Sequence, residues 1–256
     1  MAFASPAARI GRLALALGLG LPLAVHAQSG SVSGSVALSS QLVDRGQAIT
    51  PQTPVLQGAA AWAVASGWNL GASASIETRS PDHVAEALVQ AMRYWRLSAD
   101  WQMQANALYD NYPGHDRRKA FDRAEAGLGW LYRDVLSLGL SAIHPVSGSD
   151  HRLRGAVDLG VHWPLPWRLA LSAGVGIAQP TPLAYGYYAD DHAADHGDAE
   201  SYGYGSTRPY RYGHVGLLWS HGPWRIEVDR VATDGLPRVP DDLRTAAWVA
   251  TASWSF

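Results

Sequence analysis

Regular alternation of apolar residues with small or polar ones is the feature that most constrains how this chain folds. In WRLALSAGVGIAQ (residues 167–179), every second residue from Trp167 to Ile177 is apolar, and the residues between them are small or polar. A period of two residues predicts a β-strand with one apolar face. Turn-forming residues bound each such stretch. The predicted strands cover residues 31–43, 54–65, 68–78, 85–97, 101–111, 121–132, 135–144, 153–163, 167–179, 210–220, 224–233 and 245–256.

Connections between the predicted strands alternate between tight turns and longer loops. The tight ones are SG (66–67), SAD (98–100), RD (133–134), PLP (164–166) and HGP (221–223). The longer ones lie near residues 44–53, 79–84, 112–120, 145–152, 180–209 and 234–244. Short turns at one end and long loops at the other are typical of outer-membrane barrels. The sequence therefore predicts an all-β fold, a transmembrane antiparallel up-and-down β-barrel of about 12 strands.

Tryptophan positions support a membrane setting. Nine of the 11 tryptophans lie beside a tight turn or near the C-terminus, whereas Trp62 and Trp248 lie farther along their strands. Indole rings favour the membrane–water interface, so this grouping predicts an aromatic girdle, although turn-capping aromatics of a soluble core are an alternative. The girdle residues are Trp68, Trp95, Trp101, Trp130, Trp163, Trp167, Trp219, Trp224 and Trp254. The expected opposite belt consists of Tyr109, Tyr112, Tyr185, Tyr187, Tyr210 and Tyr212.

Composition and the chain ends agree with export. Residues 1–27 read as a signal peptide, with Arg9 and Arg12 before an apolar stretch and small residues at Val25 to Ala27, which leaves residues 28–256 as the barrel domain. An N-terminal membrane anchor is the alternative reading. The net charge of −2 gives no reason to expect nucleic acid, and the absence of cysteine excludes disulfides and thiolate sites. The terminal Phe256 suits recognition by the barrel assembly machinery, and we expect the outer membrane of a Gram-negative bacterium.

Charged residues on the polar face of the strands are the candidate lumen and selectivity residues. They are Arg123, Glu125, Arg154, Asp158, His162, Arg225, Glu227 and Asp229, with Glu77, Gln102, Gln104, Asn106 and His214 on the same face. Charges are costly against lipid, so these side chains must point inwards. Eight strands leave an interior filled by side chains and sixteen leave an aqueous channel. A charge-lined pore and a lumen closed by paired charges both remain open.

Two of the long loops carry further candidate sites. His192 and His196, with Asp191 and Asp195, lie four residues apart in the stretch from Tyr185 to Gly205, a spacing that makes them a weak metal candidate beside the reading of a solvated acidic loop. The same loop, with its acidic run from Asp190 to Glu200, could fold inwards as a lid over the pore. Arg117, Arg118 and Lys119 suit contacts with lipopolysaccharide phosphates or simply with water. We expect no cofactor and no metal site beyond the weak candidate of His192 and His196.

Residues 44–75, DRGQAITPQTPVLQGAAAWAVASGWNLGASAS, carry a family resemblance. They resemble the N-terminal part of a conserved proteobacterial family of unknown function named for its Gly-Cys-Trp pattern. The matching positions include Arg45, Gly46, Gln57 and Gly58, whereas Ala48, Val55 and Ser73 depart from the family pattern. The resemblance implies an outer-membrane barrel of about this length and no known activity.

The expected function is a small channel for polar solutes in outer-membrane lipid. A structural or ligand-binding barrel with an occluded lumen is the first alternative. A membrane-embedded hydrolase is the second, and it would need a His and a Ser in contact. His144 and Ser147 supply these residue types, but Pro145 between them disrupts a shared face, so we expect no enzyme activity.

Overall fold

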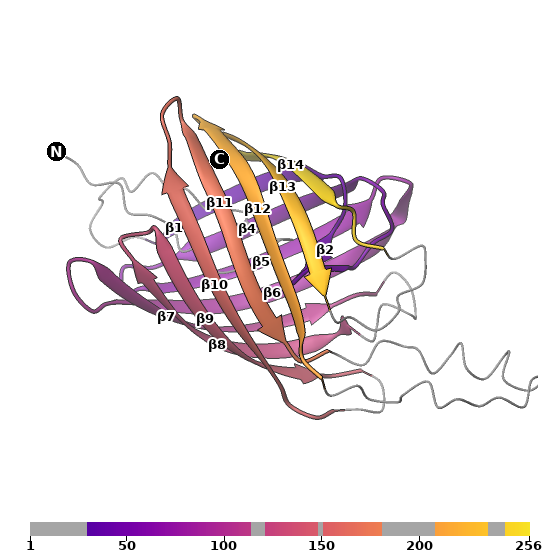
Figure 1. Cartoon of the computed structure of the whole chain (residues 1–256), viewed down its shortest axis with the longest axis horizontal. Helices are drawn as coiled ribbons and strands as arrows, with labels where there is room; N and C mark the ends of the chain where they lie inside the picture. Colours follow the sequence, from indigo (N-terminus) through magenta and orange to yellow (C-terminus); the bar gives the residue numbers. More distant parts are fainter. Residues whose placement is uncertain (1–29, 114–120, 148–150, 181–207, 235–243) are drawn as a thin grey trace, which may run out of the picture.

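The computed structural model describes residues 30–113, 121–147, 151–180, 208–234 and 244–256. Within these residues, twelve strands close into one barrel in which each wall strand pairs with the wall strands before and after it along the chain, and the first, β1, pairs with the last, β14 (Figure 1). All neighbouring pairs are antiparallel, so the predicted all-β up-and-down barrel is confirmed. The wall strands are β1 (Ser31–Ser39), β4 (Val55–Ala63), β5 (Trp68–Glu77), β6 (Ser80–Arg96), β7 (Trp101–Asn111), β8 (Arg123–Tyr132), β9 (Leu136–Pro145), β10 (Arg154–Pro164), β11 (Leu169–Ala178), β12 (Tyr210–His221), β13 (Trp224–Asp234) and β14 (Trp248–Ser255).

The outward face of the wall is apolar because side chains alternate across each strand. In β10, Val157 and Leu159 are exposed, whereas the intervening Asp158 is buried. Exposed leucines, valines and isoleucines recur on this face around the barrel, including Leu70, Leu128, Leu140, Leu171, Leu217, Ile226 and Val228. A closed barrel that presents such a surface is suited to a lipid bilayer. Among the described residues, no helix is long and apolar enough to cross a membrane, a finding that concerns helices and not strands.

The nine tryptophans predicted for the girdle all lie at the turn end of the barrel. Trp62 joins them: it is the penultimate residue of β4 and lines a hollow of the outer surface with Trp68 and Leu70. The expectation that Trp62 lies farther along its strand is therefore wrong. Arg93, also on the outer face, lies 5.4 Å from the ring centroid of Trp68 and 5.3 Å from that of Trp95. The Arg93 guanidinium therefore makes cation–π contacts with both rings, at the level where the lipid headgroup region would begin.

The expected tyrosine belt at the loop end is largely wrong. Tyr109 faces outwards, but Tyr112, Tyr210 and Tyr212 are buried inside the barrel mouth. Tyr185 and Tyr187 lie outside the described residues. The inward tyrosines have carboxylate partners there, since Tyr112 donates to Asp110 and Tyr212 donates to Asp158.

The predicted strand boundaries differ most from the structure in two places. Most of the expected loop at residues 79–84 belongs to β6, which begins at Ser80 and extends its hairpin with β5 across irregular pairing near Ile76. The predicted strand 31–43 ends at Ser39, because the chain then leaves the wall. Ser39 pairs with Val55, so the wall continues directly from β1 to β4, and the intervening residues 40–54 are not part of it.

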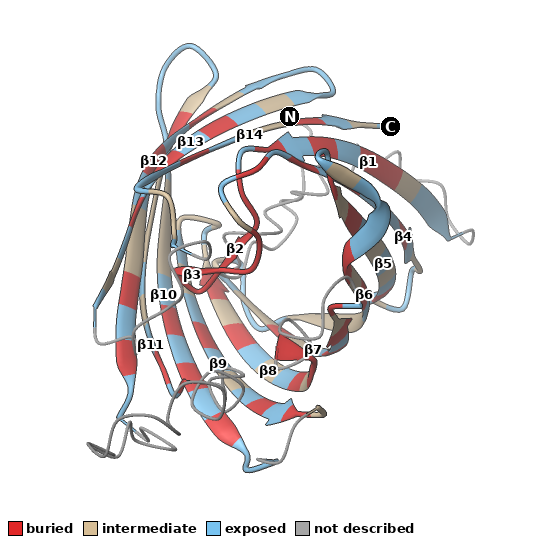
Figure 2. Ribbon diagram, turned by 90° about the vertical axis from the view of Figure 1, so that its right-hand side faces the viewer, coloured by how far each residue is buried: buried red, intermediate tan, exposed pale blue. Residues whose placement is uncertain are grey.

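Those intervening residues, 40–54, form what we call the inner loop. Figure 2 looks into the barrel and shows the short strands β2 (Val43–Asp44) and β3 (Gln47–Ala48) inside the ring of wall strands. Every residue from Gln41 to Thr50 is buried. The core of the molecule thus lies inside the barrel, between the inner loop and the wall.

The last strand closes the wall against the first. Ser255 pairs with Ser35, and the backbone groups of Phe256 exchange hydrogen bonds of 2.8 and 2.9 Å with those of Gly34. The Phe256 ring covers Gly34 so closely that a Cβ atom there would lie 2.6 Å from the ring. Because Gly34 has no side chain, it leaves the space on the outer surface that the Phe256 ring occupies.

Candidate functional site: the barrel interior

The inner loop turns at Arg45 and Gly46, both of which have positive φ angles, of 46° and 75°. Positive φ at both central residues is what a two-residue type I′ hairpin requires, and it is unfavourable for arginine. A Cβ atom on Gly46 would also lie 2.8 Å from Cβ of Tyr212. The hydroxyls of Thr233 and Thr245 both donate to the Gly46 carbonyl, at 2.7 and 2.9 Å. The turn is thereby held against β12, β13 and the segment before β14, with its arginine directed across the interior.

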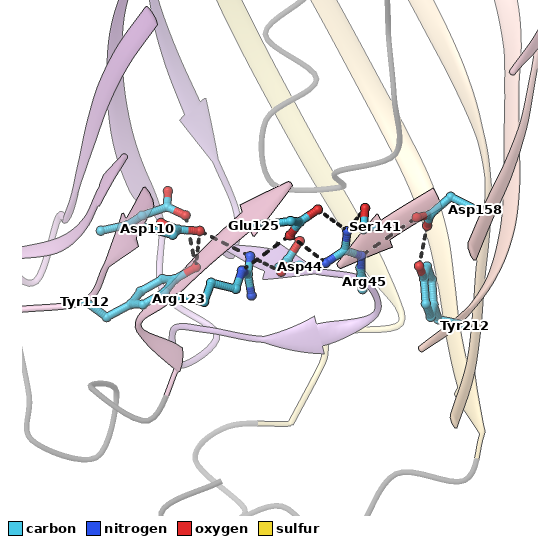
Figure 3. A network of polar contacts seen from close by, with 10 residues as sticks. Asp44, Arg45, Asp110, Tyr112, Arg123, Glu125, Ser141, Asp158 and Tyr212 are labelled. Carbon is cyan, nitrogen blue, oxygen red and sulfur yellow. Dashed lines mark hydrogen bonds and ion pairs between the residues drawn. The ribbon is translucent and has the colours of Figure 1, made fainter. Parts of the chain in front are cut away.

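Arg45 forms the central ion pair of the site (Figure 3). Its guanidinium donates to both carboxylate oxygens of Glu125 on β8, at 2.6 and 3.0 Å, and to Ser141 on β9 at 3.2 Å. Its Nε lies 3.8 Å from the carboxylate of Asp158 on β10. Arg45 and Glu125 are about 95% buried, so little solvent screens this bidentate pair. One arginine of the inner loop thus contacts three consecutive strands of the wall.

Arg123 on β8 makes the reciprocal connection from wall to loop. It donates to Asp44 of the inner loop and, at 3.1 Å, to Asp110 on β7, and its Nε lies 3.7 Å from Glu125 (Figure 3). Removing one partner from such a buried network leaves an uncompensated charge, which is strongly destabilising. The two crossed pairs, Arg45 with Glu125 and Arg123 with Asp44, therefore fix the inner loop in one position.

A small apolar cluster completes the closure at the loop end. Leu42 and Ile49 of the inner loop pack with Val55, Tyr112 and Phe121, and the rings of Tyr112 and Phe121 are 5.9 Å apart. Tyr112 follows the last residue of β7, and its burial, together with the nearby charge of Asp110, raises its pKa well above the usual value. Its hydroxyl therefore stays protonated and donates to Asp110.

On the β13 and β14 side, the inner loop meets the wall through valines. Val43 packs with Val231 and Val249. Gln41 bridges the loop to the chain before β14: its amide donates to the Arg244 carbonyl at 3.0 Å, and its carbonyl accepts from the Ala246 amide at 2.7 Å. The inner loop is thus attached around the mouth by charges on one side and by apolar and amide contacts on the other.

The turn-end half of the interior is lined differently. Many of its inward-facing residues are small or neutral, including Ser33, Ala59, Ala61, Asn69, Ser73, Gln102, Asn106, Ser137, Ser172 and Ser253, although Arg96 and His162 also face inwards there. Arg225 and Glu227 on β13 form a pair of 2.6 Å there. Asp229, the next inward residue on β13, makes no hydrogen bond with any described residue, and its Oδ1 is shielded from solvent.

The structure places every predicted lumen residue on the inner face. It brings Arg123 and Glu125 together with the inner loop, pairs Arg225 with Glu227, and sets Asp158 beside Tyr212. Arg154 instead donates to the carbonyl of Pro180 near the mouth. Their role in selectivity stays a prediction.

The residues of the family resemblance fall into two groups. Arg45 and Gly46 form the turn of the inner loop, and Gln57 points into the barrel from β4. Gly58 faces outwards from β4, where a Cβ atom would meet nothing within 4 Å. The resemblance thus marks the inner loop without indicating what it does.

Several other candidates gain no support or lie outside the described residues. His192, His196, the acidic run from Asp190 to Glu200 and the basic run from Arg117 to Lys119 all lie outside them. Within the described ranges, no three His, Asp or Glu residues are grouped as metal ligands. Ser147 donates to Asp122 at 2.9 Å, whereas the His144 ring lies 6.0 Å from that of His151.

Sequence reasoning missed the inner loop itself. It expected an inward-folding segment among residues 185–205, and not at residues 40–54. The available signal was the composition of the connection after the first strand, where Leu42, Val43 and Ile49 flank the charged turn of Asp44 and Arg45. Apolar side chains around a charged turn are unusual for a solvated loop and fit a segment that is buried against a polar wall.

Comparisons with known proteins agree with this architecture. No family model matches the chain, and no curated protein matches it. Among solved structures, the KdgM porin aligns with a TM-score of 0.52 at 9% identity, covering 88% of this chain and 99% of that one. The NanC porin aligns with a TM-score of 0.52 at 8% identity and the same coverages. The KdgM porin in complex with disordered oligogalacturonate aligns with a TM-score of 0.50 at 7% identity, covering 89% and 98%. The chain thus has the fold of outer-membrane porins, over nearly their whole length.

Proposed function

We propose that this protein is an outer-membrane channel for small polar solutes, and that its inner loop narrows the passage. The observation that carries the proposal is the charged and polar inner face of a closed twelve-strand barrel. A barrel that served only as a scaffold could fill its interior with apolar side chains at lower cost, because buried charges must be desolvated. The similarity in fold and size to the KdgM and NanC porins supports the same reading.

The proposal extends to surroundings and partners. Lipid and lipopolysaccharide would cover the outer face, the barrel assembly machinery would insert the chain after removal of residues 1–27, and a small polar solute would pass through the interior. The family of the Gly-Cys-Trp pattern is the proposed relative, carried by Arg45, Gly46, Gln57 and Gly58. The chain contains no cysteine, so this relationship rests on the remaining positions. We propose transport and no catalysis.

An occluded barrel is the second candidate, and the inner loop favours it specifically. The buried run from Gln41 to Thr50 occupies the loop-end half of the interior, and Arg45 and Arg123 anchor it. In that case the protein would act through its outer loops as a structural or ligand-binding barrel.

Conductance in a planar bilayer separates the two candidates. The refolded mature chain should give discrete current steps. Glu125→Ala should give larger steps, because it removes the carboxylate that holds Arg45. Arg154→Ala, which lies outside the crossed pairs, should keep the step size near that of the unmodified chain and change only its ion selectivity. A folded but silent barrel, in the unmodified chain and in Glu125→Ala alike, would establish the occluded reading instead.

A further inference from the structure

The charges of the interior are unbalanced, and this bears on which solute the proposed channel accepts. Among the described residues, carboxylates that face the interior outnumber guanidinium groups that do so. The carboxylates are Asp44, Glu77, Glu86, Asp110, Glu125, Asp158, Glu227 and Asp229. The guanidinium groups are Arg45, Arg96, Arg123, Arg154 and Arg225. A passage lined with an excess of one charge favours solutes of the opposite charge.

Asp229 differs from the other carboxylates of this set. It is 7% exposed, and neither of its oxygens has a hydrogen-bond or ion-pair partner among the described residues. Glu227, two residues earlier on the same face, is paired with Arg225 at 2.6 Å. Buried carboxylates in proteins are normally paired, so an isolated one needs an explanation.

The wall makes room for the Asp229 carboxylate. Its Cα partner on β12 is Gly216, and a Cβ atom at that position would overlap the Asp229 carboxylate. Its partner on β14 is Val249, which offers no polar group. These two neighbours therefore leave space for the carboxylate and supply no side-chain donor to it.

Asp229 also lies where the inner loop meets the wall. The next inward residue of β13 toward the loop end is Val231, which packs with Val43 of the inner loop and with Val249. A solute that moves from the turn end toward the mouth would therefore reach Asp229 immediately before the inner loop.

We propose that the channel selects cationic solutes and that Asp229 binds their ammonium group at the turn-end side of the inner loop. The inference rests on the proposed channel function and adds the class of solute. An ammonium group supplies the hydrogen-bond donors and the positive charge that no direct partner gives to Asp229, since the nearby Arg225 is paired with Glu227. The described residues group no three metal ligands, so one carboxylate with a second nearby suits an organic amine better than a coordinated metal ion.

The test is the reversal potential of single channels in an approximately tenfold KCl gradient, followed by block of the potassium current with the diamine putrescine. The unmodified chain should prefer potassium over chloride by about threefold or more. Asp229→Asn should lower that ratio by about half and weaken putrescine block by about tenfold. The same change at Asp82, which is exposed on the extension of β6, should alter neither value.

Gly216→Ala sharpens the test because it keeps every charge. Its methyl group would displace the Asp229 carboxylate, so putrescine block should weaken while the potassium preference is largely kept. A conducting channel that prefers chloride, or block unchanged in Asp229→Asn, would overturn the inference and leave the channel function standing. Silence of both the unmodified chain and Glu125→Ala would overturn the channel function and this inference together.

Discussion

The loop-end and turn-end halves of the barrel interior differ in what fills them and in how their charges are paired. At the loop end, the inner loop fills the space and is held by crossed ion pairs between its own residues, Asp44 and Arg45, and the wall residues Arg123 and Glu125. At the turn end, the wall presents mainly serines, alanines and amides together with Arg96, and one ion pair, Arg225 with Glu227, lies near the unpaired Asp229. The contacts of the loop-end half fix the inner loop in one position, whereas the turn-end half leaves polar groups available to a passing solute.

The largest effect is expected from replacing the inner loop, because the loop is what distinguishes the loop-end half of the interior from the turn-end half. Because Ser39 pairs with Val55, a two-residue Asn-Gly turn can connect β1 to β4 in place of residues 40–54. We expect the barrel to fold and its single-channel conductance to rise by about threefold or more, since the change empties the loop-end half of a polar interior. Planar-bilayer recording measures the change. Unchanged conductance would mean that the loop-end half does not limit the passage.

Arg123→Ala and Arg225→Ala together compare how much the ion pairs of each half contribute to the free energy of unfolding. Arg123→Ala leaves Asp44, Asp110 and Glu125 without a shared cation in a buried site, which should lower the free energy of unfolding by about 3–5 kcal/mol. Arg225→Ala, in the turn-end half, removes a cation from a single carboxylate and should cost about 1–2 kcal/mol. Urea titration followed by tryptophan fluorescence gives both values. Equal costs would refute the distinction between the halves.

Gly46→Ala probes the turn of the inner loop. Its positive φ and its contact with Tyr212 should make alanine cost about 1–3 kcal/mol, expressed as detachment of the loop. The chain has no cysteine, so Thr50→Cys, at a fully buried position, reports detachment through its rate of maleimide labelling. Labelling should accelerate in Gly46→Ala and stay slow in Gly58→Ala, where a Cβ atom meets nothing.

The smallest effect is expected outside both halves. Asp100 and Arg133 form an exposed pair between neighbouring tight turns at 2.9 Å. Water and salt screen such pairs, so Asp100→Ala should change neither conductance nor the urea midpoint. A measurable loss in either quantity would show that the turns contribute to the interior, contrary to the comparison.

The wall could be predicted from the sequence because it depends on local alternation. Residues 101–111 and 224–233 agree with β7 and β13 to within one residue, since each strand has one face toward lipid and one toward the interior. The same rule would have corrected the tyrosine belt. Tyr210 and Tyr212 share their parity with His214, which the sequence places on the lumen face, so the alternation predicts that all three point inwards.

The inner loop could not be placed from local alternation, because tertiary contacts determine its position. Arg45 meets its partners on β8, β9 and β10, which are about a hundred residues away in sequence. The same limit applies to Asp229: its parity predicts that it points inwards, but its lack of a partner depends on Gly216 and Val249 across two strand pairings.

The seam between β1 and β14 has a consequence for how the molecule is assembled. All other wall pairings join strands that follow one another along the wall, so if these pairings form in chain order, the ring closes only when the end of β14 pairs with β1. The inner loop follows β1 directly, so it lies beside the edge that stays open longest. It can therefore take up its internal position sideways, through an unsealed wall, and the final pairing of Phe256 with Gly34 then encloses it.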